Sequence, residues 1–381
     1  MESIVIVGSG LAGYSVAREV RKRDRAARLV VVTADDGHFY SKPTLSEAFR
    51  LGAPVSELSS RTAEGMAVQF KGEVLTGARA ECLDLASRTL DTSKGELVYD
   101  KLVLALGAEP VRMPLDAASL AHVFTVNDLC DYRRFREAAN GKKVVAILGA
   151  GLIGCEFAND LVDAGFHVKV IDIADAPLSR LLPSPNGVYM HAALQLAGVE
   201  WHLGTGVQAI EGRDEGVQIR CTDGESFDAD IVLSAIGLRP RTLLAREAGL
   251  AVAHGISVDA ALRTSDPRVY ALGDCAEVHG LWLPYIAPIG PAAKVVAANL
   301  TGDASVVRYA AMPVIVKTPA CPSIVCPPPI GVHGAWDTES DEAGVQSLFH
   351  DTAGLLRGFA LNGAHTERAI VLAQAMPMLL A

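Results

Sequence analysis

The sequence has few cysteines, no excess of basic residues and no long apolar run. Its seven cysteines among 381 residues form no CxxC pair, so we expect neither a disulfide framework nor a metal site. Acidic residues outnumber basic ones by 44 to 34, a net charge of −10, which argues against nucleic acid or an anionic membrane as a partner. The apolar start is interrupted by Gly8 and is too short for a membrane span. We therefore expect a cytoplasmic protein without a signal peptide.

The sequence instead contains two copies of one pattern: a buried strand, a glycine turn, a helix and a second strand. The copies start about 140 residues apart, so the repeat is of a domain type rather than a short solenoid unit. The pattern occupies residues 3–7, 11–22 and 28–33, and again residues 143–148, a helix ending near 164, and residues 167–172.

Further strands close each half of the chain. Residues 101–106 run into Gly107, residues 230–236 run into Gly237, and residues 266–275 contain a short strand before Gly-Asp. After about residue 306 prolines cluster, hairpin patterns follow, and a helix is expected near residues 365–376. This order predicts an α/β chain with two Rossmann-like dinucleotide-binding domains and a small α+β C-terminal domain.

The first glycine turn is a GxGxxG motif between a strand and a helix. Gly8 permits the tight turn, Gly10 lets the backbone approach a pyrophosphate, and Gly13 lets the helix pack on the strand. The helix N-terminus then offers N–H groups to phosphate oxygens. The motif predicts a dinucleotide site formed by Gly8, Gly10, Leu11, Ala12 and Gly13.

An acid that binds the ribose hydroxyls is expected roughly 20 residues further on, at the end of the second strand. The chain has Ala34 and Asp35 at this place. Either the Asp35 carboxylate or the backbone of Ala34 would bind the ribose.

The second glycine motif has a clearer acid. Asp172 ends the strand after it, and no arginine follows immediately. A carboxylate there accepts hydrogen bonds from ribose hydroxyls and repels a 2′-phosphate, so we expect NADH rather than NADPH. The predicted residues of this site are Gly149, Gly151, Ile153, Gly154 and Asp172.

Two dinucleotide sites in one chain suit a tightly held flavin and a nicotinamide that exchange a hydride. Gly273 and Asp274 follow a strand late in the chain, where a carboxylate can accept hydrogen bonds from the ribityl hydroxyls of FAD. Such a transfer needs no nucleophile or general base from the protein, and we assign no catalytic residue.

With these motifs in order, the chain resembles the FAD-dependent pyridine nucleotide-disulfide oxidoreductase superfamily. The segments that carry the resemblance are GSGLAG, LVLALGAEP, GAGLIGCE, LSAIGLRPRT and VYALGDCAEV. The resemblance implies a glutathione reductase-like fold. The expected domains are FAD-binding for residues 1–112 and 237–305, NAD-binding for 113–236 and C-terminal for 306–381.

The redox disulfide of the glutathione and lipoamide reductases is absent from its expected place. Residues 39–46 read FYSKPTLS there. Cys321 and Cys326 have the required separation but lie among prolines in the last module, where buried thiols are expected. Electrons must therefore leave the flavin directly for an outside acceptor.

Two further segments, TADDGHFYSKPTLSEAF and MPVIVKTPACPSIVCPPP, resemble the rubredoxin reductases of bacteria, a branch of this superfamily. The resemblance implies an enzyme that passes electrons from NADH through FAD to rubredoxin, in alkane degradation or in defence against oxygen. A flavorubredoxin or ferredoxin reductase of an oxygenase or nitric oxide reductase system remains an alternative. Glu47, where ferredoxin reductases have a lysine, speaks against the ferredoxin branch. A non-enzymatic, NADH-sensing flavoprotein is a third possibility, but the chain lacks the long insertion expected of one.

The resemblance also implies residues around the flavin. Glu156 would pair with Lys42 or with Lys317, and either cation would stabilise reduced flavin. The other implied positions are Pro43 beside Lys42, Ala80 near the adenine, Gly107 at the FAD, Gly237 at the NAD, and Ile286 at the start of the helix that approaches the flavin ring.

Because rubredoxins are acidic and this chain is too, docking would need a local basic patch. The candidates are the arginines and lysine of residues 18–28, those of residues 133–136, and the isolated Arg50 and Lys317. The sequence does not choose among them.

Overall fold

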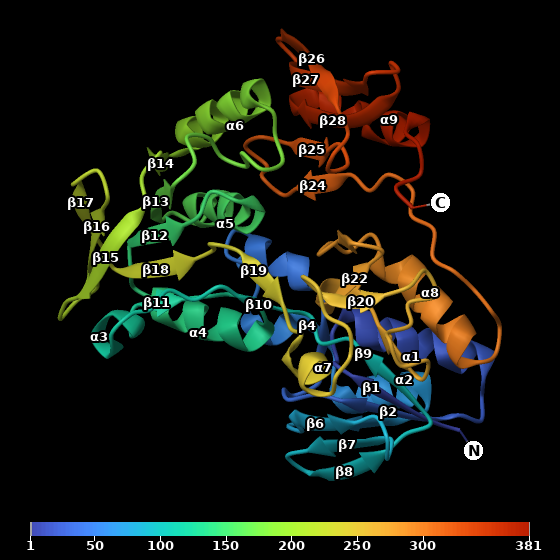
Figure 1. Cartoon of the computed structure of the whole chain (residues 1–381). Helices are drawn as coiled ribbons and strands as arrows, with labels where there is room; N and C mark the ends of the chain where they lie inside the picture. The colour runs from blue at the N-terminus through green and yellow to red at the C-terminus, as the bar shows by residue number, and fades with distance from the viewer. Residues whose placement is uncertain (1, 381) are drawn as a thin grey trace.

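The computed structural model describes residues 2–380 and contains three modules of strands and helices (Figure 1). The first is built on a parallel sheet with strand order β21-β9-β1-β2-β5. Its apolar runs are continuous because both faces of the sheet are buried. Its strands are β1 (Ser3–Val7), β2 (Arg28–Val32), β5 (Glu73–Leu75), β9 (Lys101–Leu104) and β21 (Val269–Ala271).

Helices α1 and α8 pack against each other beside this sheet (Figure 1). The helices of this module are α1 (Leu11–Arg23), α2 (Ala63–Phe70), α7 (Leu243–Glu247) and α8 (Ile289–Leu300). Its smaller strands are β3 (Phe39–Tyr40), β4 (Ser59–Arg61), β6 (Ala80–Asp84), β7 (Thr89–Thr92), β8 (Gly95–Val98), β20 (Ile256–Val258), β22 (Ala276–Val278) and β23 (Leu281–Trp282).

The second module repeats the arrangement with the order β11-β18-β12-β13-β14, again parallel. These strands are β11 (Val123–Phe124), β12 (Val144–Leu148), β13 (His167–Asp172), β14 (Val199–Leu203) and β18 (Ile231–Ser234). Its other elements are α3 (Ala117–Leu120), α4 (Leu129–Ala139), α5 (Leu152–Asp163), α6 (Ser184–Ala197), β15 (Val207–Gly212), β16 (Val217–Cys221) and β17 (Ser226–Ala229). The chain passes between the modules through an antiparallel pair, β10 (Ala108–Pro110) and β19 (Leu238–Pro240).

The third module is an antiparallel sheet of order β24-β25-β28-β27-β26 that lies beside α6 (Figure 1). A buried polar network joins them, with Asn186 Nδ2 donating to Asn362 Oδ1 at 2.7 Å and Ser347 Oγ donating to Asn186 Oδ1 at 2.6 Å. The elements are β24 (Val314–Val316), β25 (Ser323–Cys326), β26 (Gly334–Asp341), β27 (Gly344–Asp351), β28 (Leu356–Asn362) and α9 (Ala369–Ala375).

One short segment packs outside the module to which its place in the chain assigns it. Leu45, Ala48 and Phe49 follow the first strands, yet they belong to the apolar core that joins the second and third modules. Residues Lys42–Glu47 of this segment form a 3₁₀ helix. Sequence order alone did not predict this crossing.

The expected strands and helices are present with shifts of a few residues at their ends, and two details differ more. Ile286 does not start a helix, because α8 begins at Ile289 and Ile286 lies in the bend before it. The C-terminal helix is split into a 3₁₀ turn, Gly363–Arg368, and α9. No helix within residues 2–380 is long and apolar enough to cross a membrane, and these residues contain no His, Cys, Asp or Glu cluster placed to bind a metal.

Candidate dinucleotide sites and the junction between them

The three glycines of the first motif differ in what surrounds them. Gly8 has φ +119°, and a Cβ there would lie 2.1 Å from the Ala105 carbonyl oxygen, so only glycine fits. A Cβ on Gly13 would lie 1.9 Å from the Gly8 oxygen. A Cβ on Gly10 would instead meet no described atom within 4 Å. The space beside Gly10 therefore suits a ligand that approaches the backbone closely.

The second motif repeats this arrangement. A Cβ on Gly149 or Gly154 would collide with backbone atoms at 2.6 and 1.9 Å, whereas Gly151 has open space. Gly10 and Gly151 are the N-caps of α1 and α5, and no side chain within residues 2–380 caps either helix or places an acid in its first turn. The exposed N–H groups and the positive end of each helix dipole fit a pyrophosphate.

At the end of β2, the Asp35 carboxylate already has a structural task. Its Oδ1 accepts from Ser9 Oγ at 3.1 Å, Thr33 Oγ1 at 2.5 Å and Gly37 N at 2.9 Å. These bonds tie the first glycine turn to the loop after β2. Both Ala34 and Asp35 are exposed, so the two predicted modes of ribose binding remain open.

Asp172 holds the second glycine turn in the same way. Its Oδ2 accepts from Ala150 N at 2.5 Å and its Oδ1 from Ala174 N at 2.7 Å. The residue that follows, Ile173, is 76% exposed, and residues 173–179 contain neither Lys nor Arg. Directly after the strand, the edge of the site thus presents a carboxylate, and the first basic residue that follows is Arg180.

Lys42 and Asp274 come from two distant parts of the chain, and Asp274 follows Gly273, which packs beside Ala12 of the first glycine motif. Burial raises the pKa of Asp274, and the nearby Lys42 ammonium lowers it. Burial lowers the pKa of Lys42, and the Asp274 carboxylate opposes that effect. Lys42 Nζ donates to Asn127 Oδ1 at 2.6 Å. The Lys42 ammonium and the Asp274 carboxylate therefore lie close enough to affect each other's pKa.

Glu156 is paired with Lys317 rather than Lys42. Lys317 Nζ lies 2.8 Å from Glu156 Oε2, and Lys317 N donates to Glu156 Oε1 at 3.1 Å. Ser46 Oγ donates to Glu156 Oε2 at 2.7 Å, and Lys317 Nζ also donates to the Pro43 carbonyl. Residues from all three modules meet at this buried carboxylate.

The remaining predicted residues lie apart from this node. Gly107 and Gly237 flank the linker pair, where their carbonyls accept from Arg241 N and Val111 N, each at 3.0 Å. Ala80 begins β6, and Ile286 is 48% exposed before α8.

Sequence reasoning missed Arg241 and Asn127. Arg241 Nη1 donates to the Leu106 carbonyl at 3.2 Å, and its charge lowers the pKa of Lys42. Asn127 donates to the Ala108 carbonyl at 3.0 Å while it accepts from Lys42. The second arginine of LRPRT was a usable signal for Arg241, whereas nothing in the sequence singled out Asn127.

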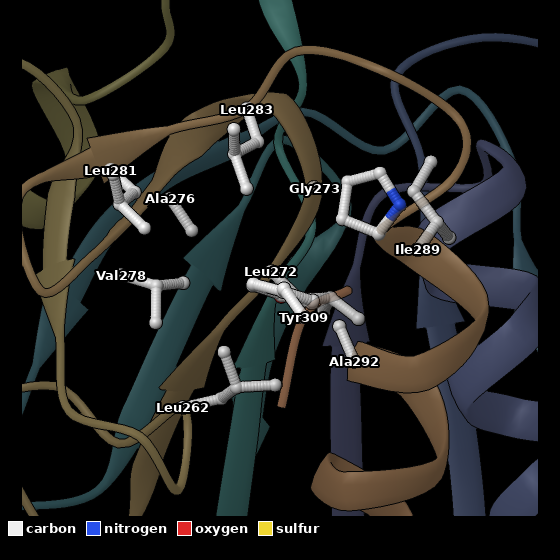
Figure 2. Close-up of a pocket in the computed structure, with 11 residues that line it drawn as sticks. Leu262, Leu272, Gly273, Ala276, Val278, Leu281, Leu283, Ile289, Ala292 and Tyr309 are labelled. Atoms are coloured by element: carbon white, nitrogen blue, oxygen red, sulfur yellow. The ribbon is translucent and has the colours of Figure 1, made fainter. Parts of the chain in front are cut away.

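A small cavity of about 20 Å³ is lined in part by Gly273 (Figure 2). Aliphatic side chains line it, among them Leu262, Val278 and Ala292. Its size and apolar walls exclude a dinucleotide, so it belongs to the core of the first module.

The basic cluster of residues 18–28 is largely used for structure. Arg21 donates to the carbonyls of Phe70, Asp24, Ala27 and Lys71, and Arg23 pairs with Asp303 at 2.8 Å. Along α1 the distance from Gly10 grows from about 12 Å at Arg18 to about 20 Å at Arg23, the last residue of the helix.

Comparison with known proteins now adds to this geometry. Residues 2–297 match the family described as pyridine nucleotide-disulphide oxidoreductase. The chain belongs to this family. Residues 306–376, the third module, match the domain described as rubredoxin binding C-terminal domain.

Similar proteins cover nearly the whole chain. A rubredoxin-NAD(+) reductase of Alcanivorax borkumensis is 44% identical over 100% of both chains. A nitric oxide reductase FlRd-NAD(+) reductase of Aeromonas hydrophila is 36% identical over 98% of this chain and 96% of its own. The solved putidaredoxin reductase–putidaredoxin complex superposes with a TM-score of 0.89 at 25% identity, covering 99% of this chain and 94% of that one.

The pyridine nucleotide-disulphide oxidoreductases use FAD and NAD(H). The two open glycine turns and the desolvated Asp274 fit that pair of cofactors. In contrast to the family name, all seven cysteines, which lie within the described residues, are free thiols, and Cys321 and Cys326 are buried.

Proposed function

We propose that this protein is an FAD-dependent NADH:rubredoxin oxidoreductase. The observation that carries the proposal is the node at Glu156. This carboxylate lies on the helix that begins at the second glycine turn, and it binds Lys317 of the module that matches the rubredoxin-binding domain. It also binds Ser46, which lies four residues after Lys42. The helix of the second glycine turn, the segment that carries Lys42 and the acceptor module thus meet at one carboxylate.

The first glycine turn with Leu11 and Ala12, together with Asp274, Lys42 and Pro43, would hold FAD. Gly107, Ala80, Ile286 and either Ala34 or Asp35 would lie around it. The second turn with Ile153, Asp172 and Gly237 would hold NADH. When bound, FAD accepts a hydride and releases electrons singly. The protein's part is to position both groups and to balance charge.

Lys317 and Lys42 differ in what they can do for charge. The Lys317 ammonium is engaged by Glu156, Ser46 and the Pro43 carbonyl, so it neutralises a buried carboxylate. The Lys42 ammonium has Asn127 as its hydrogen-bond partner and faces Asp274. We propose that Lys42 is the cation that stabilises reduced flavin and that Lys317 positions the segment carrying it.

The test is stopped-flow absorbance of the FAD-loaded protein. NADH should bleach the flavin rapidly, NADPH slowly, and the reduced protein should then reduce purified rubredoxin. A flavin that NADH does not bleach would contradict the proposal at its first step. A bleached flavin that leaves rubredoxin oxidised would contradict the choice of acceptor.

A second candidate acceptor is flavorubredoxin, because the Aeromonas hydrophila relative is named as its reductase and is 36% identical. Reduction of flavorubredoxin at least about tenfold faster than of rubredoxin, a 1.4 kcal/mol preference, would favour this candidate.

With rubredoxin as acceptor, we propose a role in alkane degradation. We place the protein in the cytoplasm, where exposed thiols such as Cys82 and Cys130 stay reduced.

A further inference from the structure

Helix α5 presents an unusual row of polar side chains on one face. Glu156, Asn159, Asp160 and Asp163 follow the i, i+3, i+4, i+7 spacing of a single helical stripe. Glu156, Asn159 and Asp160 are 5%, 0% and 2% exposed. Buried polar groups need partners. Asn159 Nδ2 donates to Asp163 on the same helix at 2.8 Å, and the other partners come from other parts of the chain. Asn159 Oδ1, for example, accepts from Ala320 N at 3.0 Å.

Asp160 binds the backbone of residues 42–50, which we call the Lys42 segment. Its Oδ2 accepts from Phe49 N at 3.1 Å and its Oδ1 from Arg50 N at 2.8 Å. Both carboxylate oxygens thus hold consecutive N–H groups at the end of the segment that carries Lys42 and Pro43. Hydrogen bonds to an ionised, buried acceptor are among the stronger ones in proteins.

Other contacts also hold the Lys42 segment against the second and third modules. Arg136 of α4 donates to the Ala48 carbonyl at 3.0 Å, and its guanidinium lies 4.4 Å from the centre of the Phe49 ring. Lys317 and Glu156 hold Ser46. The second and third modules therefore grip a segment that belongs in sequence to the first.

We propose that Asp160 is a positioning residue that holds the Lys42 segment against the helix beginning at the second glycine turn. Asp160 lies nine residues after Gly151 on one rigid helix, so it would keep Lys42 in register with the bound nicotinamide. This inference rests on the proposed function. Hydride transfer is sensitive to misplacements of about 1 Å, which gives the clamp a direct effect on rate.

The charges that face Asp160 make the clamp sensitive to pH. Burial raises the pKa of its carboxyl to about 6, while the segment's N–H groups and the cations of Arg50 and Arg136 oppose that rise. The other ionisable groups around it are Tyr132 on α4, Glu47 on the segment, and Glu156 and Asp163 on α5 itself. Opening of the segment alone leaves Asp160 buried without its two N–H donors, so protonation favours the open segment and the clamp should loosen as the pH falls to about 6 and below. Complete unfolding, which frees the carboxyl into water, has the opposite pH dependence.

The experiment compares the FAD-loaded wild type with Asp160→Asn and with Asp163→Asn. Asp163 is the matched control, because it lies on the same helix but holds no backbone N–H of the segment. Its Oδ2 accepts from Asn159 Nδ2 at 2.8 Å, a bond that an Asn side chain can keep through its amide oxygen, and lies 3.9 Å from Arg50 Nε. Amide hydrogen exchange at Phe49 and Arg50 should be about tenfold faster or more in Asp160→Asn and unchanged in Asp163→Asn. The rate constant of flavin reduction at saturating NADH should fall in Asp160→Asn, while the NADH affinity stays unchanged. The decrease in this rate constant that we expect for the wild type near pH 6 should be absent in the variant.

The inference would be overturned if Asp160→Asn had the same amide exchange and the same rate constant of flavin reduction as the wild type across pH 5–8. If that variant does not fold, the pH dependence of hydrogen exchange in the wild type tests the clamp by itself. Protection of the two amides, corrected for intrinsic exchange, should then fall below about pH 6, and constant protection would overturn the clamp. If NADH does not bleach the flavin of the wild type, the proposed function is contradicted. The hydrogen-exchange data would still test the clamp by themselves.

Discussion

Lys317 Nζ lies 2.8 Å from Glu156 Oε2, and this ion pair joins the rubredoxin-binding module to the helix of the second glycine turn. The Glu156 side chain is 6% exposed and that of Lys317 22%. A carboxylate so buried needs its cation, since an unpaired buried charge is costly. The pair therefore fixes the third module on the second.

Replacing Lys317 by Met should destabilise the protein by about 3 kcal/mol, because it leaves the Glu156 carboxylate buried and unpaired. Urea unfolding followed by circular dichroism measures the loss. The double variant Glu156→Gln with Lys317→Met should recover much of it, since no buried charge remains. A double variant as unstable as the sum of the two single ones would show that the residues act independently.

Gly151→Ala should fold and bind FAD but lose about tenfold or more in NADH affinity, some 1.4 kcal/mol. Its Cβ would enter the open space beside the α5 N-terminus. Gly149→Ala is the contrasting variant, because its Cβ would lie 2.6 Å from the Ala235 oxygen and should lower stability instead. Titration of NADH by fluorescence, with thermal melts of both variants, separates the two effects. Unchanged NADH affinity in Gly151→Ala would place the nucleotide elsewhere.

The preference for NADH should reverse in the double variant Asp172→Ala with Ile173→Arg. The change removes the carboxylate that would repel a 2′-phosphate and adds a guanidinium at an exposed position. Flavin bleaching by NADPH should accelerate about tenfold or more, and bleaching by NADH should slow. Because Asp172 also holds Ala150 N and Ala174 N, a melting curve is needed beside the kinetics. Equal rates with NADH and NADPH in the wild type would refute the role of Asp172.

Asp160→Asn should change how stability depends on pH. Burial raises the Asp160 pKa from 3.8 to about 6, so the folded state binds this proton more tightly than the unfolded state. The free energy of unfolding therefore loses up to about 3 kcal/mol from this group as the pH rises from about 4 to 6. The difference between wild type and Asp160→Asn isolates that contribution from other carboxyls. A difference that stays constant across this range would argue against a titrating Asp160.

Charge reversal at Arg23 and Arg25 should leave the rate of rubredoxin reduction unchanged. Both lie at or beyond the C-terminal end of α1, about 20 Å along the helix from the first glycine turn. Stopped-flow reduction of rubredoxin at low ionic strength checks this, because docking through charge is strongest there. A loss of about tenfold or more would mean that the cluster does form the docking patch.

The strands, helices and glycine turns could be read along the chain because their signals are local. The alternation of apolar runs and glycines at residues 3–33 and 143–172 reflects backbone geometry that each segment imposes by itself. Gly13 and Gly154 are dictated by the carbonyls of Gly8 and Gly149 within their own turns, whereas Gly8 and Gly149 also need the space left by Ala105 and Ala235. The family could be recognised for the same reason, as its motifs are short and contiguous.

The partners of buried charges depended on contacts between residues more than 100 positions apart in the chain. Glu156 could have met Lys42 or Lys317, and only the docking of the third module onto α5 selected Lys317. No sequence signal distinguished Asp160, because an acid on a helix is usually solvated. Only the tertiary structure buries it against Phe49 N and Arg50 N. Local backbone geometry is determined by neighbouring residues in the sequence. The partner of a buried charge is determined by the surface that tertiary packing places against it.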